Sequence, residues 1–490
     1  MKYLAFVVFC LGAVIFLSST LSCAEVSQSQ PSITVTVDPR VELMCIIARL
    51  AGYDEYMTGE FPAYVADVDS FFSSFRNHDV VSFARTIRPR GIGFEKVMQM
   101  AIAVTDAYTM QEIIPLDSLE SPLSKHWRTD DAREFLQMAR RFAAETNFRG
   151  FIDRHKALYD TARSRFLAVA QSTHIAEWLT EYFGYNADCN FEIILGLQIG
   201  NNNYGASLAR KGGRGTIYSF IGVASVDAEG WPEFYPGVNE TVLHEMAHSF
   251  VNPLTKDAEP ELKSAGERIY PHVASAMARM AYNDWRIMLN ESLVRAIGIR
   301  HEDWRYSARE ASIIQEGEEE RGFYWIGGLS ELLTTYEAQR SSYPDFKSFF
   351  PRIVAYLNQY SLNVPDEIQK LTLRKKQAMA RLEAHSPKIV SINPPDGAQD
   401  VDPLLRFITV VFDRPMRGGY SVMTRGRGMG EAPVTRGECR WDSTKTVFAW
   451  PVTLQPDTEY GFSLNGKWNL EFQSVGGDPL VPTLIRFKTR

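Results

Sequence analysis

The sequence predicts an α+β protein in which a mainly helical region is followed by an all-β sandwich. Apolar residues recur at helical spacing through most of the first 385 residues. Short β-branched runs interrupt this pattern from residue 191 onward. From residue 386 the sequence changes to short alternating runs separated by proline, glycine and aspartate, which is typical of a β-sandwich. A chain of 490 residues is expected to form two or three domains.

The N-terminus has the composition of a targeting segment. One lysine precedes an apolar run over residues 3–17, and small and polar residues follow. This predicts a signal peptide over residues 1–24, because the run is too short to favour a membrane-spanning helix. Two endings stay open: cleavage after Ala24, or a bacterial lipoprotein signal in which Cys23 becomes the lipidated first residue. Both predict export to the periplasm, the outside or the cell envelope.

Composition and charge narrow the classes of partner. The apolar fraction of 45% and the charged fraction of 23% are those of a globular protein. The net charge of −7 argues against a nucleic-acid partner, which requires a clustered basic surface. Three of the five cysteines lie beyond the targeting segment and form no CxxC pair, which excludes a thiolate zinc cluster.

The region over residues 33–385 divides into two parts. A short strand, ITVTV, opens it, and a helical pattern then extends to about residue 190. The second part begins with two strand candidates, FEIILGLQIG and GTIYSFIGVAS, joined by the Asn- and Gly-rich stretch NNNYGASLARKGGRG, which we expect to be a loop or hairpin. Amphipathic helices return after Pro253 and continue to His385.

The C-terminal region reads as a separate domain over residues 386–490. Its strand candidates are punctuated by turn signals such as PPDG. SINPPDGAQDV followed by ITVVFDRPM resembles the start of bacterial immunoglobulin-like modules, and this resemblance implies an Ig-like β-sandwich.

The stretch TVLHEMAHSF contains the pattern His244-Glu245-x-x-His248. Residues four apart share a helix face, so both histidines can reach one metal ion. Zinc accepts imidazole nitrogen, and a catalytic zinc commonly keeps three protein ligands plus a water. Glu245 stands beside the first ligand and can take the proton of a metal-bound water as general base. The pattern therefore predicts a hydrolytic zinc site.

The surrounding residues predict a packed helix for this motif. Asn239 suits the N-cap and Glu240 suits the first turn. Asn252-Pro253 should end the helix, because the residue before proline disfavours the helical conformation. We therefore expect a helix of about three turns.

The third ligand must come from elsewhere in the chain. Val251 and Leu254 rule out the extended pattern HExxHxxGxxH. Glu291 lies in an apolar helical stretch, where a buried carboxylate needs a partner, and a zinc ion is one such partner. A salt bridge to Arg295 is the alternative explanation of this carboxylate. The other ligand candidates are Asp284, His272 and His301.

HEMAHSFVNP followed by NESLVRA resembles the zinc metallopeptidases of the gluzincin kind. Over residues 33–385 the chain more closely resembles an uncharacterised family of secreted bacterial HExxH proteins, whose N-terminal segment is similar to VDPRVELMCIIARLAGYDEY. The resemblance implies a zincin-like fold with Zn²⁺ on His244, His248 and Glu291 and with Glu245 as general base. It also implies that the strand within GTIYSFIGV presents its edge to an extended peptide.

The leading hypothesis is a secreted or membrane-anchored zinc metallopeptidase that acts on a peptide or protein. One alternative is a catalytically silent zincin-fold protein that binds peptide or glycan, and another is a metal-dependent hydrolase of a non-peptide substrate. The helical part before residue 191 could also cover the cleft. The candidates for stabilising an oxyanion are Tyr204, Arg295, Arg321 and Tyr324.

Overall fold

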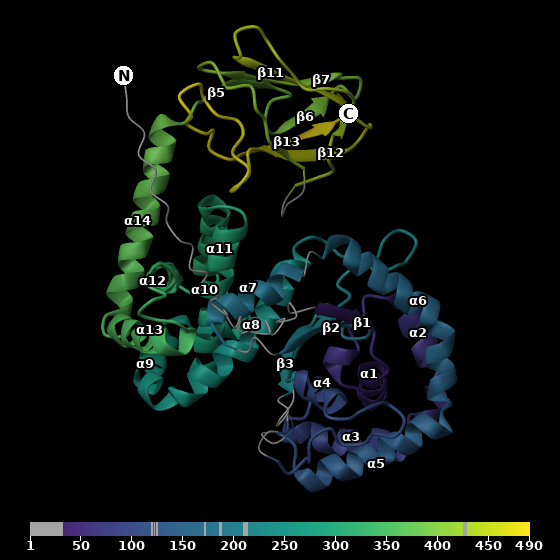
Figure 1. The fold of residues 1–490 in the computed structure, drawn as a ribbon. Helices are drawn as coiled ribbons and strands as arrows, with labels where there is room; N and C mark the ends of the chain where they lie inside the picture. Colours follow the sequence, from purple (N-terminus) through teal and green to yellow (C-terminus); the bar gives the residue numbers. More distant parts are fainter. Residues whose placement is uncertain are drawn as a thin grey trace, which may run out of the picture.

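The computed structural model describes residues 33–490 except 119–120, 122, 124–125, 171–172, 186–188, 209–213 and 425–428. The predicted signal segment, with Cys23, lies outside the described residues. Helices dominate the described chain up to His385, and β-strands make up the C-terminal region (Figure 1). The predicted α+β class is therefore confirmed. In the part of the chain that the structure describes, no helix is long and apolar enough to span a membrane.

A four-stranded sheet, in the order β1-β2-β4-β3, connects the N-terminal helices to those that follow. Its strands are β1 (Ile33–Thr36), β2 (Asn190–Gly196), β3 (Asn203–Leu208) and β4 (Thr216–Gly222). Strands β1, β2 and β4 are parallel, whereas β3 runs antiparallel to β4. The strand expected at ITVTV is confirmed, and of the loop or hairpin expected at NNNYGASLARKGGRG the hairpin is correct, because β3 pairs antiparallel with β4.

The edge strand differs from the one implied by the resemblance. Strand β4, within GTIYSFIGV, pairs with β2 on one side and β3 on the other, so its edges are not open to a peptide. Strand β3 lies at the end of the described sheet instead. The alternate residues Tyr204, Ala206 and Leu208 of this strand are buried.

Between β1 and β2 the described residues form seven α-helices, and α1 lies inside the arc made by α2, α3, α5 and α6 (Figure 1). They are α1 (Pro39–Ala51), α2 (Pro62–Phe71), α3 (Asp79–Ile87), α4 (Glu95–Ile102), α5 (Thr129–Glu145), α6 (Phe148–Val169) and α7 (Thr173–Phe183), with short 3₁₀ helices at Asp54–Tyr56, Ser73–Phe75 and Arg88–Arg90. Asp38 caps α1 by accepting a hydrogen bond from the Arg40 N–H (2.7 Å), and Gly52 ends it in the left-handed conformation.

A buried carboxylate joins α1 to the sheet. Glu42 is fully buried and accepts hydrogen bonds from the Tyr64 hydroxyl (2.6 Å), the Gln198 amide (2.9 Å) and the Leu197 N–H (3.3 Å). Burial raises the pKa of Glu42, and these three donors lower it by less. Because Leu197 and Gln198 directly follow β2, this one side chain fixes the end of the central strand against α1 and α2.

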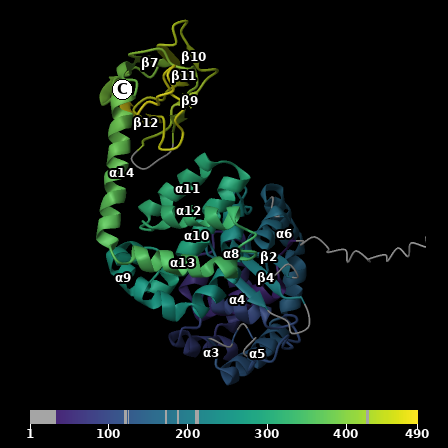
Figure 2. The ribbon, with the colours of Figure 1, turned by 60° about the vertical axis from the view of Figure 1, so that its left-hand side comes forward.

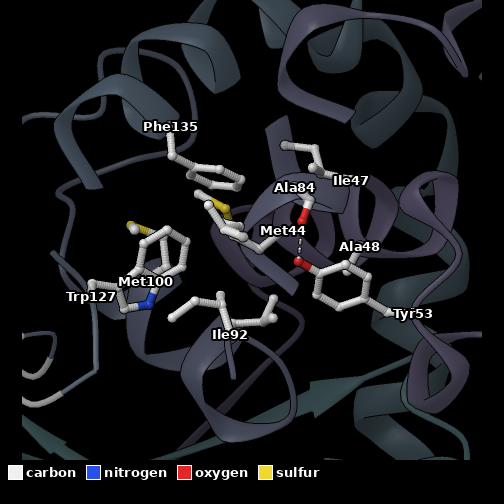
Figure 3. A pocket seen from close by; sticks show the side chains of 11 residues that line it. Met44, Ile47, Ala48, Tyr53, Ala84, Ile92, Met100, Trp127 and Phe135 are labelled. Carbon is white, nitrogen blue, oxygen red and sulfur yellow. Dashed lines mark hydrogen bonds between the residues drawn. The ribbon is translucent and has the colours of Figure 1, made fainter. Parts of the chain in front are cut away.

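The space among α1, α3, α4 and α5 contains a small apolar cavity of about 10 Å³ (Figure 3). Its lining is almost entirely aliphatic, aromatic or sulfur-containing, and the Tyr53 hydroxyl at its edge donates a hydrogen bond to the Ala84 carbonyl (2.8 Å). A cavity of this size has room for about one water at most and offers it few polar partners. We therefore assign it to core packing.

The second set of helices follows the sheet. It comprises α8 (Val238–Asp257), α9 (Glu259–Ala278), α10 (Trp285–Arg305), α11 (Ala308–Glu320), α12 (Ile326–Ala338), α13 (Phe346–Tyr360) and α14 (Val364–His385). Helix α8 packs on β3, β4 and α10. Strand β3 comes so close that a Cβ at Gly205 would lie 2.1 Å from the Glu245 carbonyl oxygen. The sheet therefore sets the position of the motif helix directly.

Helix α8 is longer than the sequence predicts at both ends. It begins at Val238, and Asn239 is not the N-cap; its amide donates instead to the Pro236 carbonyl (2.7 Å). At the other end the helix continues through Pro253 to Asp257. Leu254 and Thr255 are buried beyond the proline, so tertiary packing outweighs the hydrogen bond that Pro253 cannot donate.

The C-terminal region consists of two sheets that enclose a second core. Helix α14 ends at His385 and extends along one side of the molecule to these sheets (Figure 2). One sheet has the order β10-β11-β7-β5, with β9 beside β11, and the other has the order β6-β13-β12-β8. The strands are β5 (Ile389–Asn393), β6 (Ala398–Val401), β7 (Phe407–Phe412), β8 (Val422–Met423), β9 (Val434–Thr435), β10 (Arg440–Trp441), β11 (Val447–Thr453), β12 (Glu459–Leu464) and β13 (Thr483–Thr489). Phe448, Phe462 and Phe487 fill the space between the sheets, as expected of a sandwich.

A groove of about 1300 Å³ separates the β region and α14 from α11, α12 and α13. Among the described residues, Lys375 pairs with Glu319 across it (2.6 Å), Lys467 pairs with Glu320, and Arg309 donates to the Trp468 carbonyl (3.1 Å). None of the predicted ligands His244, His248 and Glu291 lines this groove or the small cavity.

Two glycine replacements test how tightly β3 and α8 pack. Gly205→Ala should destabilise the fold by about 1–3 kcal/mol, because its Cβ would meet the backbone of α8. Gly298→Ala is the control, because a Cβ added at this position inside α10 would meet no other atom within 4 Å. This replacement should stabilise the fold by about 1 kcal/mol, because alanine favours the helix more than glycine does. Thermal unfolding midpoints should therefore move in opposite directions. Equal midpoints for the two variants would contradict the close approach.

Candidate metal centre

Three side chains from two helices converge on one point. His244 and His248 lie on α8, and Glu291 lies on α10, which packs against it. The two histidine Nε2 atoms are 3.3 Å apart. Glu291 Oε2 lies 3.5 Å from Nε2 of His244, and its Oε1 lies 3.3 Å from Nε2 of His248. All three ligand atoms lie within 4.8 Å of one another, so these residues can hold a metal ion together.

The other ligand candidates serve different roles. Asp284 is the N-cap of α10 and accepts hydrogen bonds from the Arg286 and Ile287 N–H groups. His272 is exposed on α9. His301 is buried, with its ring 4.9 Å from that of Trp178. Glu291 is therefore the candidate that the fold brings to the histidine pair.

The donor set fits a metal ion. The two imidazole nitrogens lie 3.3 Å apart, and when they carry no proton each offers a lone pair that a cation beside them can accept. Glu291 is buried, and burial acts to raise its pKa. Hydrogen bonds from His244 and His248 outweigh burial and hold the pKa of Glu291 well below its usual value. The group is therefore an anionic carboxylate facing nitrogen donors, as divalent metal binding requires.

Glu245 lies next to this group without belonging to it. Burial raises the pKa of the Glu245 carboxyl above its usual value, and the charges of His244 and His248 lower it by less. Within the described ranges, no hydrogen bond holds its carboxylate. Glu245 is thus a carboxyl of raised pKa beside the three ligands, which is the placement that a general base needs.

A second set of residues holds the ligands in place. The Asn252 Oδ1 lies 3.2 Å from His248 Nδ1, on the side of the ring away from the converging atoms. Sequence reasoning assigned Asn252 only to the helix end. Its position four residues after His248, on the same helix face, is the signal that could have identified it.

The Glu291 carboxylate also has partners of its own. The Tyr282 hydroxyl donates to Glu291 Oε2 (2.9 Å), and Arg295 Nη2 lies 3.4 Å from the same oxygen. Arg295 donates in turn to both oxygens of Glu318, at 2.9 and 2.8 Å. The salt bridge between Glu291 and Arg295 therefore exists alongside the histidine contacts. Tyr282 and Glu318 lie outside any local motif, and sequence reasoning missed them.

The four oxyanion candidates lie in different places. Arg295 contacts Glu291, as described above, and Arg321 binds Glu318 (2.5 Å). Tyr324 lines the groove beside α14. The Tyr204 hydroxyl is buried and makes no hydrogen bond with another described residue. Of the four, only Arg295 touches a candidate ligand.

Metal analysis tests the three-residue site directly. Chain 25–490, dialysed against a Zn²⁺ buffer and then against metal-free buffer, should retain about one metal ion per molecule by elemental mass spectrometry. Glu291→Ala should lose it, because two histidines remain where three ligands are needed. Glu331→Ala, at an exposed carboxylate on α12, is the matched control and should keep the ion. Full retention in Glu291→Ala would remove Glu291 from the site.

The contact between Asn252 and His248 predicts a smaller effect. Asn252→Ala should lower zinc affinity about tenfold, because the His248 ring loses the partner that fixes its orientation. Competition with a chromogenic chelator measures the change. Asn358→Ala on α13 removes an asparagine that contacts a backbone carbonyl far from the ligands, and its affinity should equal that of the wild type. An unchanged affinity in Asn252→Ala would show that the contact does not support His248.

No curated protein matches the chain. One solved structure, described as "Crystal structure of the S-layer protein rSbsC(31-844)", is 12% identical, with a TM-score of 0.16. The match covers 84% of this chain and 46% of that chain, and at this TM-score it carries no structural argument. A family model described as "Domain of unknown function (DUF4932)" matches residues 33–356, a range that includes all three candidate ligands and Glu245. The chain therefore belongs to the DUF4932 family.

Proposed function

We propose that the protein is an exported zinc-dependent metallopeptidase. The observation that carries this proposal is the convergence of His244, His248 and Glu291 with Glu245 beside them. Two imidazoles and one carboxylate are a donor set typical of catalytic zinc, which keeps a further position for water or substrate. A bound zinc ion would supply a water of lowered pKa and would polarise the carbonyl that the water attacks.

Glu245 is the group that moves protons in this proposal. Its carboxylate accepts a proton from the attacking water and returns it to the departing amine. Burial raises the pKa of Glu245, which makes its carboxylate a stronger base. A protein that only binds a ligand has no use for such a base, so this residue favours catalysis over the silent binding role.

Strand β3 supports a peptide as the substrate. It is the last strand of the described sheet, and its backbone passes against the Glu245 backbone at Gly205. An extended peptide that paired with the outer edge of β3 would lie along α8 close to the ligands. Main-chain hydrogen bonds of this kind are open to a peptide and not to a small ester or amide.

The site of action follows from the N-terminal sequence. The predicted signal segment assigns the protein to the outside of the cytoplasmic membrane, and the lipoprotein form of this signal would carry its lipid on Cys23. The substrate is then a peptide or protein of the cell envelope or its surroundings.

Replacing the base separates catalysis from metal binding. Glu245→Gln should keep one zinc ion per chain and lose roughly 10²–10⁴-fold in kcat for peptide hydrolysis, because the water loses its proton acceptor. Hydrolysis is followed by mass spectrometry of a peptide library. Asp257→Asn, at the exposed end of the same helix, is the control and should hydrolyse peptides at the wild-type rate.

Three outcomes would redirect the proposal. Normal peptide hydrolysis by Glu245→Gln would exclude Glu245 as the base. A zinc-loaded wild type that cleaves esters or non-peptide amides, and no peptide, would identify a different hydrolase. A stable partner that stays uncleaved after long incubation would favour the binding protein.

A further inference from the structure

The two oxygens of Glu291 have different surroundings. Oε2 faces His244 Nε2 at 3.5 Å, and it also accepts a hydrogen bond from the Tyr282 hydroxyl (2.9 Å) and lies 3.4 Å from Arg295 Nη2. Oε1 faces His248 Nε2 at 3.3 Å, and no other donor in the described chain contacts it. A carboxylate oxygen that is already engaged by two donors has little capacity left for a metal ion. The two oxygens are therefore unequal before any metal ion arrives.

The direction of the Tyr282 hydrogen bond is fixed by chemistry. Arg295 Nη2 lies 2.8 Å from the Tyr282 hydroxyl oxygen, and a guanidinium can only donate. The phenol oxygen must accept this bond, so its own proton is left for Glu291 Oε2. Tyr282 thus acts as a donor to the carboxylate and cannot present a lone pair to it.

Arg295 is itself held from the opposite side. It donates to both oxygens of Glu318, a buried carboxylate on α11, and its guanidinium lies 5.0 Å from the Phe323 ring centroid. Arg321 in turn binds Glu318. Charges therefore alternate along Glu291, Arg295, Glu318 and Arg321. The side chains of Arg295 and Glu318 are only 14% and 6% exposed, so their geometry is constrained by packing as well as by charge.

We propose that Tyr282 and Arg295 are positioning residues that occupy Oε2 of Glu291 and commit it to bind the metal ion through Oε1. A glutamate that binds with one oxygen uses one coordination position, whereas one that binds with both uses two. The network thereby keeps open the position that water and substrate need. This inference rests on the proposed metal site, and it explains how one coordination position stays open there for water and substrate.

The test uses Co²⁺ in place of zinc, because its visible absorption reports coordination number. Four-coordinate Co²⁺ absorbs much more strongly than five- or six-coordinate Co²⁺. Wild-type chain 25–490 should bind one Co²⁺ and show the strong four-coordinate spectrum. Tyr282→Phe and Arg295→Lys should each bind Co²⁺ about tenfold more weakly, with weaker absorption as the freed Oε2 joins the ion.

Two matched variants control for general destabilisation. Tyr356→Phe removes a tyrosine hydroxyl that donates to the Trp325 carbonyl (2.8 Å) away from the ligands. Arg300→Lys alters an arginine on the same helix that pairs with both oxygens of Glu337. Both should keep the wild-type Co²⁺ affinity and spectrum. If Arg295→Lys does not fold, Tyr282→Phe, which removes a single oxygen atom, decides the question.

The outcomes separate this inference from the proposed function. Failure of the folded wild type to bind Co²⁺ or Zn²⁺ would overturn the metal site, and the proposed function with it. Binding by the wild type, with an unchanged spectrum and affinity in Tyr282→Phe, would overturn the positioning role alone. Equal losses in Tyr282→Phe and Tyr356→Phe would also overturn it, because a shared loss reports stability and not ligation.

Discussion

The charge of Glu291, buried where α8 crosses α10, is the constraint on which the site depends. Both helices bury mainly apolar side chains around this point, including Leu243, Met246, Leu289 and Val294. An uncompensated carboxylate in such surroundings would cost several kcal/mol. The histidines on one side and the tyrosine and arginine on the other supply the compensation. The two histidines, the tyrosine and the arginine therefore allow α8 and α10 to pack together with a buried carboxylate between them.

The helices before β2 belong to the same body as the site. Residues of α1, the sheet, α8 and α10 form one continuous hydrophobic core, and Glu42 ties α1 to the end of β2. The sheet sets α8 through the contact at Gly205. Removing the N-terminal helices would expose this core. These helices therefore support the fold around the site, and they are not a separate segment that covers it. A detachable inhibitory segment would instead need a contact surface of its own.

Sequence patterns were informative where the signal is local. The helical and alternating periods predicted the α+β division, and the HExxH spacing with an isolated carboxylate in an apolar helix located His244, His248 and Glu291. The missing parts depend on contacts between distant segments. Strand β3 is polar in composition and is a strand because it pairs with β4. Tyr282 and Glu318 join the site through helix packing that no local period records. Pro253 sits inside α8 because residues beyond it are buried.

The surroundings of Glu291 and the β region after His385 are held in place by interactions of different strength. Around Glu291 the charged groups are buried and each has more than one partner, so moving one group leaves another uncompensated. The β region meets α11 through the exposed pair of Lys467 and Glu320, and exposed ion pairs contribute about 0–1 kcal/mol. Beyond such contacts its connection is α14, a helix of which little is buried. The buried surroundings of Glu291 can therefore hold metal ligands in fixed positions, as catalysis requires. The β region can move relative to them at a much lower cost in free energy, because it is held by exposed contacts.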